Sequence, residues 1–172
     1  MTSIYLAGKI YKNDWRHEVA PIRGVWGPPT GEERLTPWPV LRESVLRTFD
    51  YVGPYFQADD HGCFHGRNSH GCDESNCGGV YEAPTRADLQ SRCFKAIQKA
   101  DIVFAWLDDP TAYGTLVEIG YAKGLGKRVV VATPDYNYAK GDMWFAHVGS
   151  EVMWQPTAYK ALVDLAISEL KV

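Results

Sequence analysis

The stretch DIVFAWLDDPTAYGTLVEIGYAKGLGKRVVVAT, residues 101–133, decides the fold class of this chain. An apolar run at 101–107 precedes a segment with helical spacing at 114–126, and a second apolar run follows at 128–133. Short apolar runs separated by a helix are typical of neighbouring parallel strands that are buried on both faces. We therefore expect a strand, a helix and a parallel strand here.

Segments on either side continue this alternation. The pattern predicts strands at 3–8, 49–56 and 151–155, the last at an edge, and helices at 85–100 and 157–170. The expected fold class is α/β, with a doubly wound, mainly parallel five-stranded sheet flanked by helices, of the flavodoxin or Rossmann type. A chain of 172 residues fits a single domain, 1–172.

Residues 21–84 interrupt the alternation with an irregular excursion. Residues 21–39 are rich in proline and glycine, whereas residues 57–84 are polar, rich in Gly, His and Cys, and without periodicity. In a compact domain, such a segment indicates a functional loop.

Composition excludes several classes of partner. The formal net charge is -3 and no basic cluster stands out, which argues against nucleic acid and against an anionic membrane surface. The N-terminal segment has neither the basic flank of a signal peptide nor the length of a membrane span, so we expect a cytoplasmic protein. The four cysteines are then expected to be thiols or metal ligands rather than disulfides.

Three stretches follow the carboxyl ends of predicted strands, where doubly wound sheets bind their ligands. These stretches are AGK at 7–9, DDPTAYGT at 108–115 and TPDYNY at 133–138. We expect them to meet at one edge of the sheet.

Glu118 permits two interpretations. Thr115 and Glu118 fit a capping box, in which the glutamate bonds back to the start of its helix. Alternatively, apolar neighbours desolvate the carboxylate and raise its pKa, while the helix N-terminus and hydrogen-bond donors favour its ionised form. A charged but poorly hydrated carboxylate is suited to nucleophilic catalysis.

Four motifs together resemble the nucleoside 2-deoxyribosyltransferase superfamily, which includes nucleotide N-glycosidases such as CMP hydrolases. The resemblance covers 3–8 and most of 88–170, and its most specific part is the Gly-Thr-x-x-Glu core. The motifs are IYLAG (4–8), ADIVFAWLDD (100–109), YGTLVEIGYAKGLGKRVVVA (113–132) and GDMWFAHVGSEVM (141–153).

The resemblance implies a covalent mechanism that needs no cofactor. Glu118 would attack the anomeric carbon of a nucleoside or nucleoside 5′-monophosphate and expel the base, and a second base or water would resolve the glycosyl ester. Tyr5 would hold the carboxylate by a hydrogen bond, although an ordinary strand aromatic is the alternative. Further substrate contacts are expected at Gly8, Gly114 and Thr115.

The sequence departs from the family pattern at two acidic positions. Cys93 stands where an aspartate binds sugar hydroxyls, and we retain it as a substrate contact, while Ala112 stands where a second aspartate faces the base. Asp108 and Asp109 are the expected replacement acids, although turns after strands are rich in aspartate anyway.

In the family a neighbouring subunit completes the pocket, and the matching residues here are Asp142 and Trp144. A homodimer or higher homo-oligomer with shared active sites is therefore implied. The alternative is a surface helical turn whose aromatic residues simply pack.

The segment DDHGCFHGRNSHGCDESNC, residues 59–77, leaves three interpretations open. A structural zinc ion would stiffen the loop. A substrate lid would use His65 and, as an anion contact, Arg67, and the third interpretation is an inert loop. The candidate zinc ligands are Cys63, His70, Cys72 and Cys77.

Two classes of function follow. The favoured one is an enzyme that cleaves an N-glycosidic bond by transfer or hydrolysis. The alternative is a non-catalytic module that senses a nucleotide-like ligand, for which the changes at Cys93 and Ala112 are the support.

Overall fold

The computed structural model describes residues 1–10, 15–19, 44–54, 86–134, 141 and 143–171. Most of the 21–84 excursion lies outside this set, including the whole of 59–77. The predictions for Asp142 and for the TPDYNY stretch beyond Pro134 also fall outside it.

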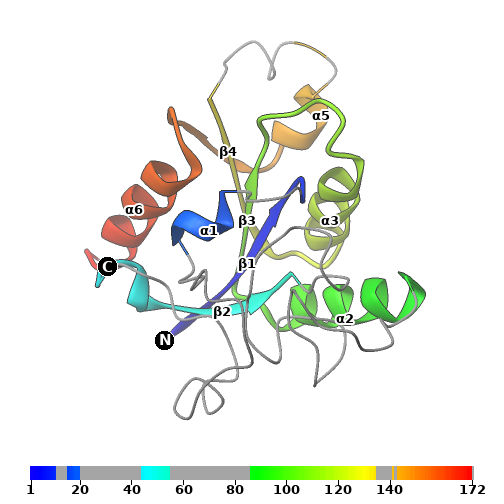
Figure 1. The fold of residues 1–172 in the computed structure, drawn as a ribbon, viewed down its shortest axis with the longest axis horizontal. Coiled ribbons are helices and arrows are strands. Elements are labelled where there is room, and N and C mark those ends of the chain that lie inside the picture. The colour runs from blue at the N-terminus through cyan, green and yellow to red at the C-terminus, as the bar shows by residue number, and fades with distance from the viewer. Residues whose placement is uncertain (11–14, 20–43, 55–85, 135–140, 142, 172) are drawn as a thin grey trace, which may run out of the picture.

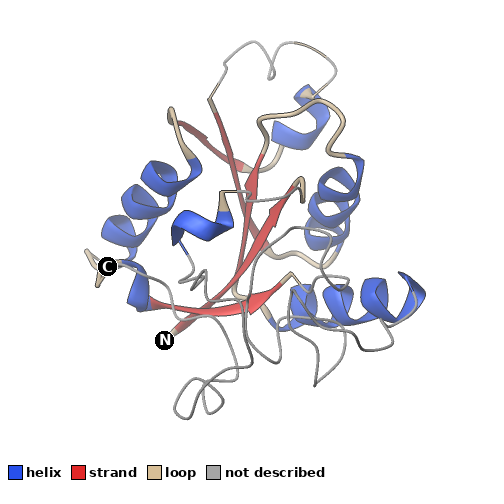
Figure 2. Ribbon diagram, in the orientation of Figure 1, coloured by secondary structure: helices blue, strands red, loops and turns tan. Residues whose placement is uncertain are grey.

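A five-stranded sheet forms the centre of the molecule (Figure 2). The strands run in the order β2-β1-β3-β4-β5, and every neighbouring pair is parallel. The predicted α/β class is confirmed, and the sheet described is parallel throughout rather than mainly. The strands are β1 Thr2–Gly8, β2 Phe49–Gly53, β3 Ile102–Trp106, β4 Arg128–Thr133 and β5 Glu151–Trp154.

Helices cover both faces of the sheet, as Figure 1 shows. One face packs against α1, the short turn η2 and α6, and the other packs against α2, α3 and α5. The helices at 85–100, 114–126 and 157–170 were predicted from sequence, but α1 was not. The elements are α1 Arg16–Val19, η2 Leu46–Thr48, α2 Arg86–Lys99, α3 Tyr113–Gly124, α5 Trp144–His147 and α6 Ala158–Glu169.

Successive residues of β1 enter opposite halves of the core. Ile4 and Leu6 pack toward α6, whereas Tyr5 and Ala7 pack toward α2 and α3. This alternation follows from the pleat of a strand, in which neighbouring side chains point to opposite faces. Each fully buried apolar side chain contributes about 1.5–3 kcal/mol, so β1 is held firmly from both sides.

The second predicted strand, 49–56, is shorter than expected. β2 ends at Gly53 because the following residue, Pro54, has no backbone N–H to donate to a ladder. At the other edge, Arg128 of β4 bonds Glu151 of β5 and Glu169 of α6, each at 2.6 Å. These ion pairs connect β5 and α6 to β4.

The chain crosses from one side of β1 to the other between β2 and β3. Such a reversal of strand order opens a crevice at the carboxyl ends of the two central strands, which is where ligands bind in this class of fold. Here the two strands are β1 and β3, so Gly8 and Trp106 mark the edge at which a site is expected.

Candidate active site

The capping interpretation of Glu118 is wrong. Helix α3 begins at Tyr113, its N-cap residue is Ala112, and no side chain caps that end. Thr115 lies inside the first turn and is buried, and Glu118 belongs to the second turn. Its carboxylate is therefore too far along the helix to serve the free N–H groups at the start.

Glu118 instead binds a tyrosine from the central strand. The Tyr5 hydroxyl donates a hydrogen bond of 2.5 Å to Oε1 of Glu118. Tyr5 is fully buried, whereas Glu118 keeps part of its surface accessible. The tyrosine thus holds one carboxylate oxygen from the protein side of the site.

Burial raises the pKa values of both Tyr5 and Glu118. Desolvation raises the pKa of Glu118 to about 7, against the opposing effects of the Tyr5 hydrogen bond and the positive charge of Arg16. The pKa of Tyr5 lies well above its usual value, first because of burial and then because of the nearby Glu118 charge. Near neutral pH, Glu118 is therefore the member of the pair that ionises, while Tyr5 remains the proton donor.

Arg16 is a buried cation that the sequence analysis missed. Its Nε donates to the Leu6 carbonyl at 3.0 Å and its Nη2 donates to the Gly8 carbonyl at 2.8 Å. The guanidinium also stacks over the Trp15 ring at 4.7 Å. Arg16 thus anchors the end of the strand that carries Tyr5, and its one-turn helix is too short to leave a periodic signal in the sequence.

The two changed family positions both lie near this pair. Cys93 is buried on α2, and its thiol lies within hydrogen-bonding reach of the Tyr5 hydroxyl. Ala112 is buried at the start of α3. The structure therefore places a thiol near the Tyr5 hydroxyl and a methyl group at the start of α3.

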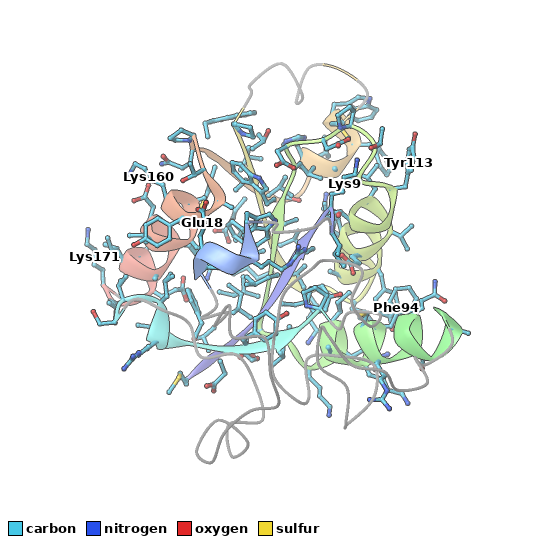
Figure 3. All side chains as sticks on the ribbon, viewed as in Figure 1. Lys9, Glu18, Phe94, Tyr113, Lys160 and Lys171 are labelled. Carbon is cyan, nitrogen blue, oxygen red and sulfur yellow. The ribbon has the colours of Figure 1, made fainter. Side chains whose placement is uncertain are left out.

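Lys9 joins two of the three stretches expected at the ligand edge. Its Nζ donates to Asp109 at 2.5 Å and to Thr111 at 2.7 Å. Figure 3 shows Lys9 at the end of β1, beside the beginning of α3. The loops after β1 and β3 are thus bonded to each other, and a lysine directly after Gly8 was the sequence signal for this contact.

The two adjacent aspartates differ in their surroundings. Asp109 accepts from Lys9 and from the hydroxyl and N–H of Thr111, and these bonds lower its pKa to about 2, with the Lys9 bond the largest cause. Asp109 is therefore ionised at neutral pH and has no proton to give. Asp108 is half-buried beside it at the same edge.

The structure places the remaining predicted substrate contacts at the end of β1 and in the first turn of α3. Gly8 is buried against Trp15 and Arg16, and a Cβ atom there would lie 2.8 Å from Nε1 of Trp15. Gly114 is exposed at the start of α3, and Thr115 is buried in its first turn.

Several candidate ligands cannot be placed. His65, Arg67 and Asp142 lie outside the described residues, as do the four candidate zinc ligands. Within the described ranges, no group of three or more His, Cys, Asp or Glu side chains is placed to hold a metal ion.

Helix α5 presents aromatic residues at the surface. Trp144 is 54% exposed and Phe145 is 75% exposed, and their rings contact each other at 5.4 Å. Lys123 of α3 donates to the carbonyls of Ala146 and Val148, each at 2.6 Å. The element that carries Trp144 is thereby fastened to the helix that carries Glu118.

A family model described as nucleoside 2-deoxyribosyltransferase matches residues 57–157, more than half of the chain. The chain belongs to this family. The match includes Glu118 and Cys93 but leaves out β1 with Tyr5, whereas it reaches further toward the N-terminus than the resemblance at 88–170. Searches of curated proteins and of solved structures gave no match.

Membership in the nucleoside 2-deoxyribosyltransferase family makes enzymatic action on nucleosides the activity expected at family level. Helix α3, which carries Glu118, begins after the loop that follows β3, at the edge of the sheet where this fold class binds ligands. In the part of the chain that the structure describes, no helix has the length and apolar character needed to cross a membrane.

Proposed function

We propose that this protein cleaves the N-glycosidic bond of a nucleoside or nucleoside 5′-monophosphate through a covalent ester on Glu118. The single observation that carries the proposal is the Tyr5–Glu118 hydrogen bond, which holds a desolvated carboxylate on α3, the helix that follows β3. With a pKa of about 7, about half of these carboxylates are ionised at neutral pH, and they are poorly solvated, as nucleophilic catalysis requires.

The first step forms one bond and breaks another. A Glu118 carboxylate oxygen attacks C1′ of the sugar while the bond from C1′ to the base breaks, and the base leaves with the bonding electron pair. The base needs a proton as it departs, and we assign this proton to Asp108, since Asp109 is held ionised by Lys9. This division of roles follows that of retaining glycosidases.

The second step releases the sugar from the enzyme. A second base or a water molecule attacks C1′ and gives its proton to Asp108, while the Glu118 carboxylate leaves with its electron pair, so the enzyme returns to its starting state. Tyr5 donates its hydrogen bond to the Glu118 carboxyl group in both steps, and the protonation of Tyr5 does not change. No cofactor is needed for either step.

Exposed apolar residues on α5 support a homo-oligomer. Trp144, Phe145 and Val148 are all more than half exposed, which is unusual for large apolar side chains on one short element. In our proposal this element completes the pocket of a neighbouring subunit, with Trp144 stacking on the base and Asp142 bonding the sugar.

The enzyme and the sensor are separated by one assay. The protein is incubated with a panel of nucleosides and 5′-monophosphates, with and without an acceptor base, and free or exchanged base is measured by chromatography. We expect base release from wild type and none above background from Glu118→Ala. Release that survives Glu118→Ala undiminished contradicts the nucleophile, and no release from any substrate favours the non-catalytic sensor.

Trapping identifies the covalent step directly. Acid quenching during turnover, followed by peptide mass spectrometry, should find the mass of a pentose or pentose phosphate on the peptide that contains Glu118. The matched control, Glu118→Gln, should carry no added mass.

Residues 59–77 are addressed by a separate measurement. Metal analysis of purified wild type and of Cys72→Ser tests the zinc proposal, because one zinc per chain in wild type and a loss in the variant support it. If wild type contains no zinc, the substrate lid and the inert loop remain as the two interpretations of residues 59–77.

A further inference from the structure

Gly53, the last residue of β2, lies beside the ring of Tyr5. It is the register partner of Tyr5 on one side, and Val103 of β3 is the partner on the other. Register partners in a sheet point to the same face. The tyrosine therefore stands between a glycine and a valine, and its ring lies over Gly53.

A side chain at Gly53 does not fit beside the tyrosine. A Cβ atom placed on Gly53 would lie 2.6 Å from Cε2 and 2.7 Å from Cδ2 of Tyr5, and 3.3 Å from Cβ of Ala96. Carbon atoms in contact are about 3.5–4.0 Å apart, so the ring would have to move by about 1 Å.

The Tyr5 ring has no free side to which it can move. Tyr5 and Val103 are both fully buried, and Cys93 and Ala96 of α2 pack in the same cluster. Protein interiors are close-packed and transmit such displacements instead of absorbing them. A displaced ring takes its hydroxyl with it, so the 2.5 Å bond to Glu118 would lengthen or break.

A positive φ angle is not the reason for a glycine at this position, although the register between β1 and β2 shifts just before it, between Ile4 and Tyr5 of β1. The glycines with positive φ in the described chain are Gly126 and Gly149, and Gly53 is not one of them. Glycine inside a strand weakens it, and often marks a place where another group approaches closely. At Gly53 the approaching group is the Tyr5 ring.

We propose that Gly53 is a positioning residue, whose missing side chain fixes the Tyr5 ring and, through the Tyr5 hydroxyl, the orientation of the Glu118 carboxylate. The kinetic consequence rests on the proposed function, but the structural consequence does not. Gly53 itself touches neither the substrate nor the reacting atoms in this proposal.

The structural test is a titration of the Glu118 carboxyl by NMR in protein labelled with 13C-glutamate, with the signal assigned by Glu118→Gln. Because Tyr5 lowers the pKa of Glu118, Gly53→Ala should raise it as Tyr5→Phe does. The double variant should titrate like Tyr5→Phe alone. Arg16 and Cys93, the other charged or titratable groups acting on the pair, stay unchanged in all variants.

Gly124→Ala is the matched control, since a Cβ at this exposed α3 glycine meets no atom within 4 Å among the described residues. It should leave the Glu118 titration as in wild type. Two results would overturn the proposal: a wild-type Glu118 pKa in Gly53→Ala, or a larger shift in the double variant than in Tyr5→Phe.

A stability measurement covers the case in which Gly53→Ala does not fold. Tyr5→Val removes the ring, so adding Gly53→Ala to it should cost little stability, since only the 3.3 Å approach to Cβ of Ala96 remains. A loss in that background as large as the loss in the wild-type background would show that Gly53 serves something other than the ring, and would reject the proposal.

The kinetic test separates this inference from the proposed function. We expect Gly53→Ala to lower kcat about tenfold to a hundredfold with little change in KM, and to move the acid limb of the pH profile upward as Tyr5→Phe does. A wild-type acid limb in Gly53→Ala would contradict the inference. If wild type releases no base, the proposed function fails, and the titration still decides whether Gly53 positions Tyr5.

Discussion

The Tyr5 hydroxyl and the Glu118 carboxylate, 113 positions apart in the chain, lie 2.5 Å apart across β1 and α3. Tyr5 is fully buried and Glu118 is half-buried, so the bond fixes the carboxylate from the interior of the protein. This hydrogen bond therefore affects both the pKa of Glu118 and the direction of its carboxylate.

Tyr5→Phe should move the acid limb of the kcat/KM profile to higher pH. The change removes a hydrogen bond that lowers the pKa of Glu118 and leaves the desolvation that raises it to about 7 in wild type. We also expect kcat to fall about tenfold to a hundredfold, because the ring remains but the carboxylate loses its anchor. A profile measured across the acid limb checks this, and an unmoved limb would contradict it.

Glu118→Gln should stabilise the protein more at high pH than at low pH. The folded pKa of about 7 lies above the value of 4.5 for an unperturbed glutamate, so the folded state binds the proton more tightly. Stability is thus lost as pH rises from about 4.5 to about 7, and this penalty persists above that range.

Urea denaturation of wild type and Glu118→Gln measures this penalty. The gain in stability of the variant should be about 2–3 kcal/mol larger at about pH 8 than at about pH 5. An equal gain at both pH values would show that the carboxyl is not desolvated in the folded protein.

A comparison of Arg16→Met with Arg16→Lys should separate the effect of the Arg16 charge on the pKa of Glu118 from the effect of its hydrogen bonds on stability. Methionine leaves the Leu6 and Gly8 carbonyls without their buried donors and should cost about 2–4 kcal/mol of stability. It also removes a charge that lowers the pKa of Glu118, so the acid limb moves up. Lysine should keep the acid limb near wild type while losing stability, because it lacks the forked donors.

Asp109→Asn should change activity without moving either limb of the pH profile. Asp109 is ionised above about pH 2, so it does not titrate in the working range, and its loss acts by freeing Lys9. Asp108→Asn should instead lower the rate of base release, because it removes the proton donor that we assign to the departing base. A larger loss of base release with Asp109→Asn than with Asp108→Asn would reverse the two assignments.

Mixing two inactive variants tests the shared pocket. Trp144→Ala and Glu118→Ala should each be inactive, but a mixture allowed to exchange subunits should recover about a quarter of wild-type activity, since hybrid dimers hold one intact site. Sedimentation shows whether the variants still associate. No recovery between variants that do associate would place Trp144 outside a shared pocket.

Sequence patterns were sufficient for the five strands and for α2, α3 and α6, but not for the short helices α1 and α5. The apolar runs at 3–8, 101–107 and 128–133 became β1, β3 and β4, because strands buried on both faces must be apolar throughout. The Gly-Thr-x-x-Glu motif also singled out Glu118, because a carboxylate among apolar residues stands out in one dimension. The family match over 57–157 includes this residue, and its role as the nucleophile stays a prediction.

Only the tertiary structure decided what Glu118 is bonded to. The choice between a cap and a catalytic carboxylate depended on where α3 begins, and helix boundaries are poorly defined by local pattern. Arg16, Lys9 and Gly53 act through contacts with distant parts of the chain, at Leu6 and Gly8, at Asp109 and at Tyr5. Local periodicity determined which segments form strands and helices, whereas the packing of β1 between β2 and β3 determined which side chains meet, because such contacts depend on sheet order and register.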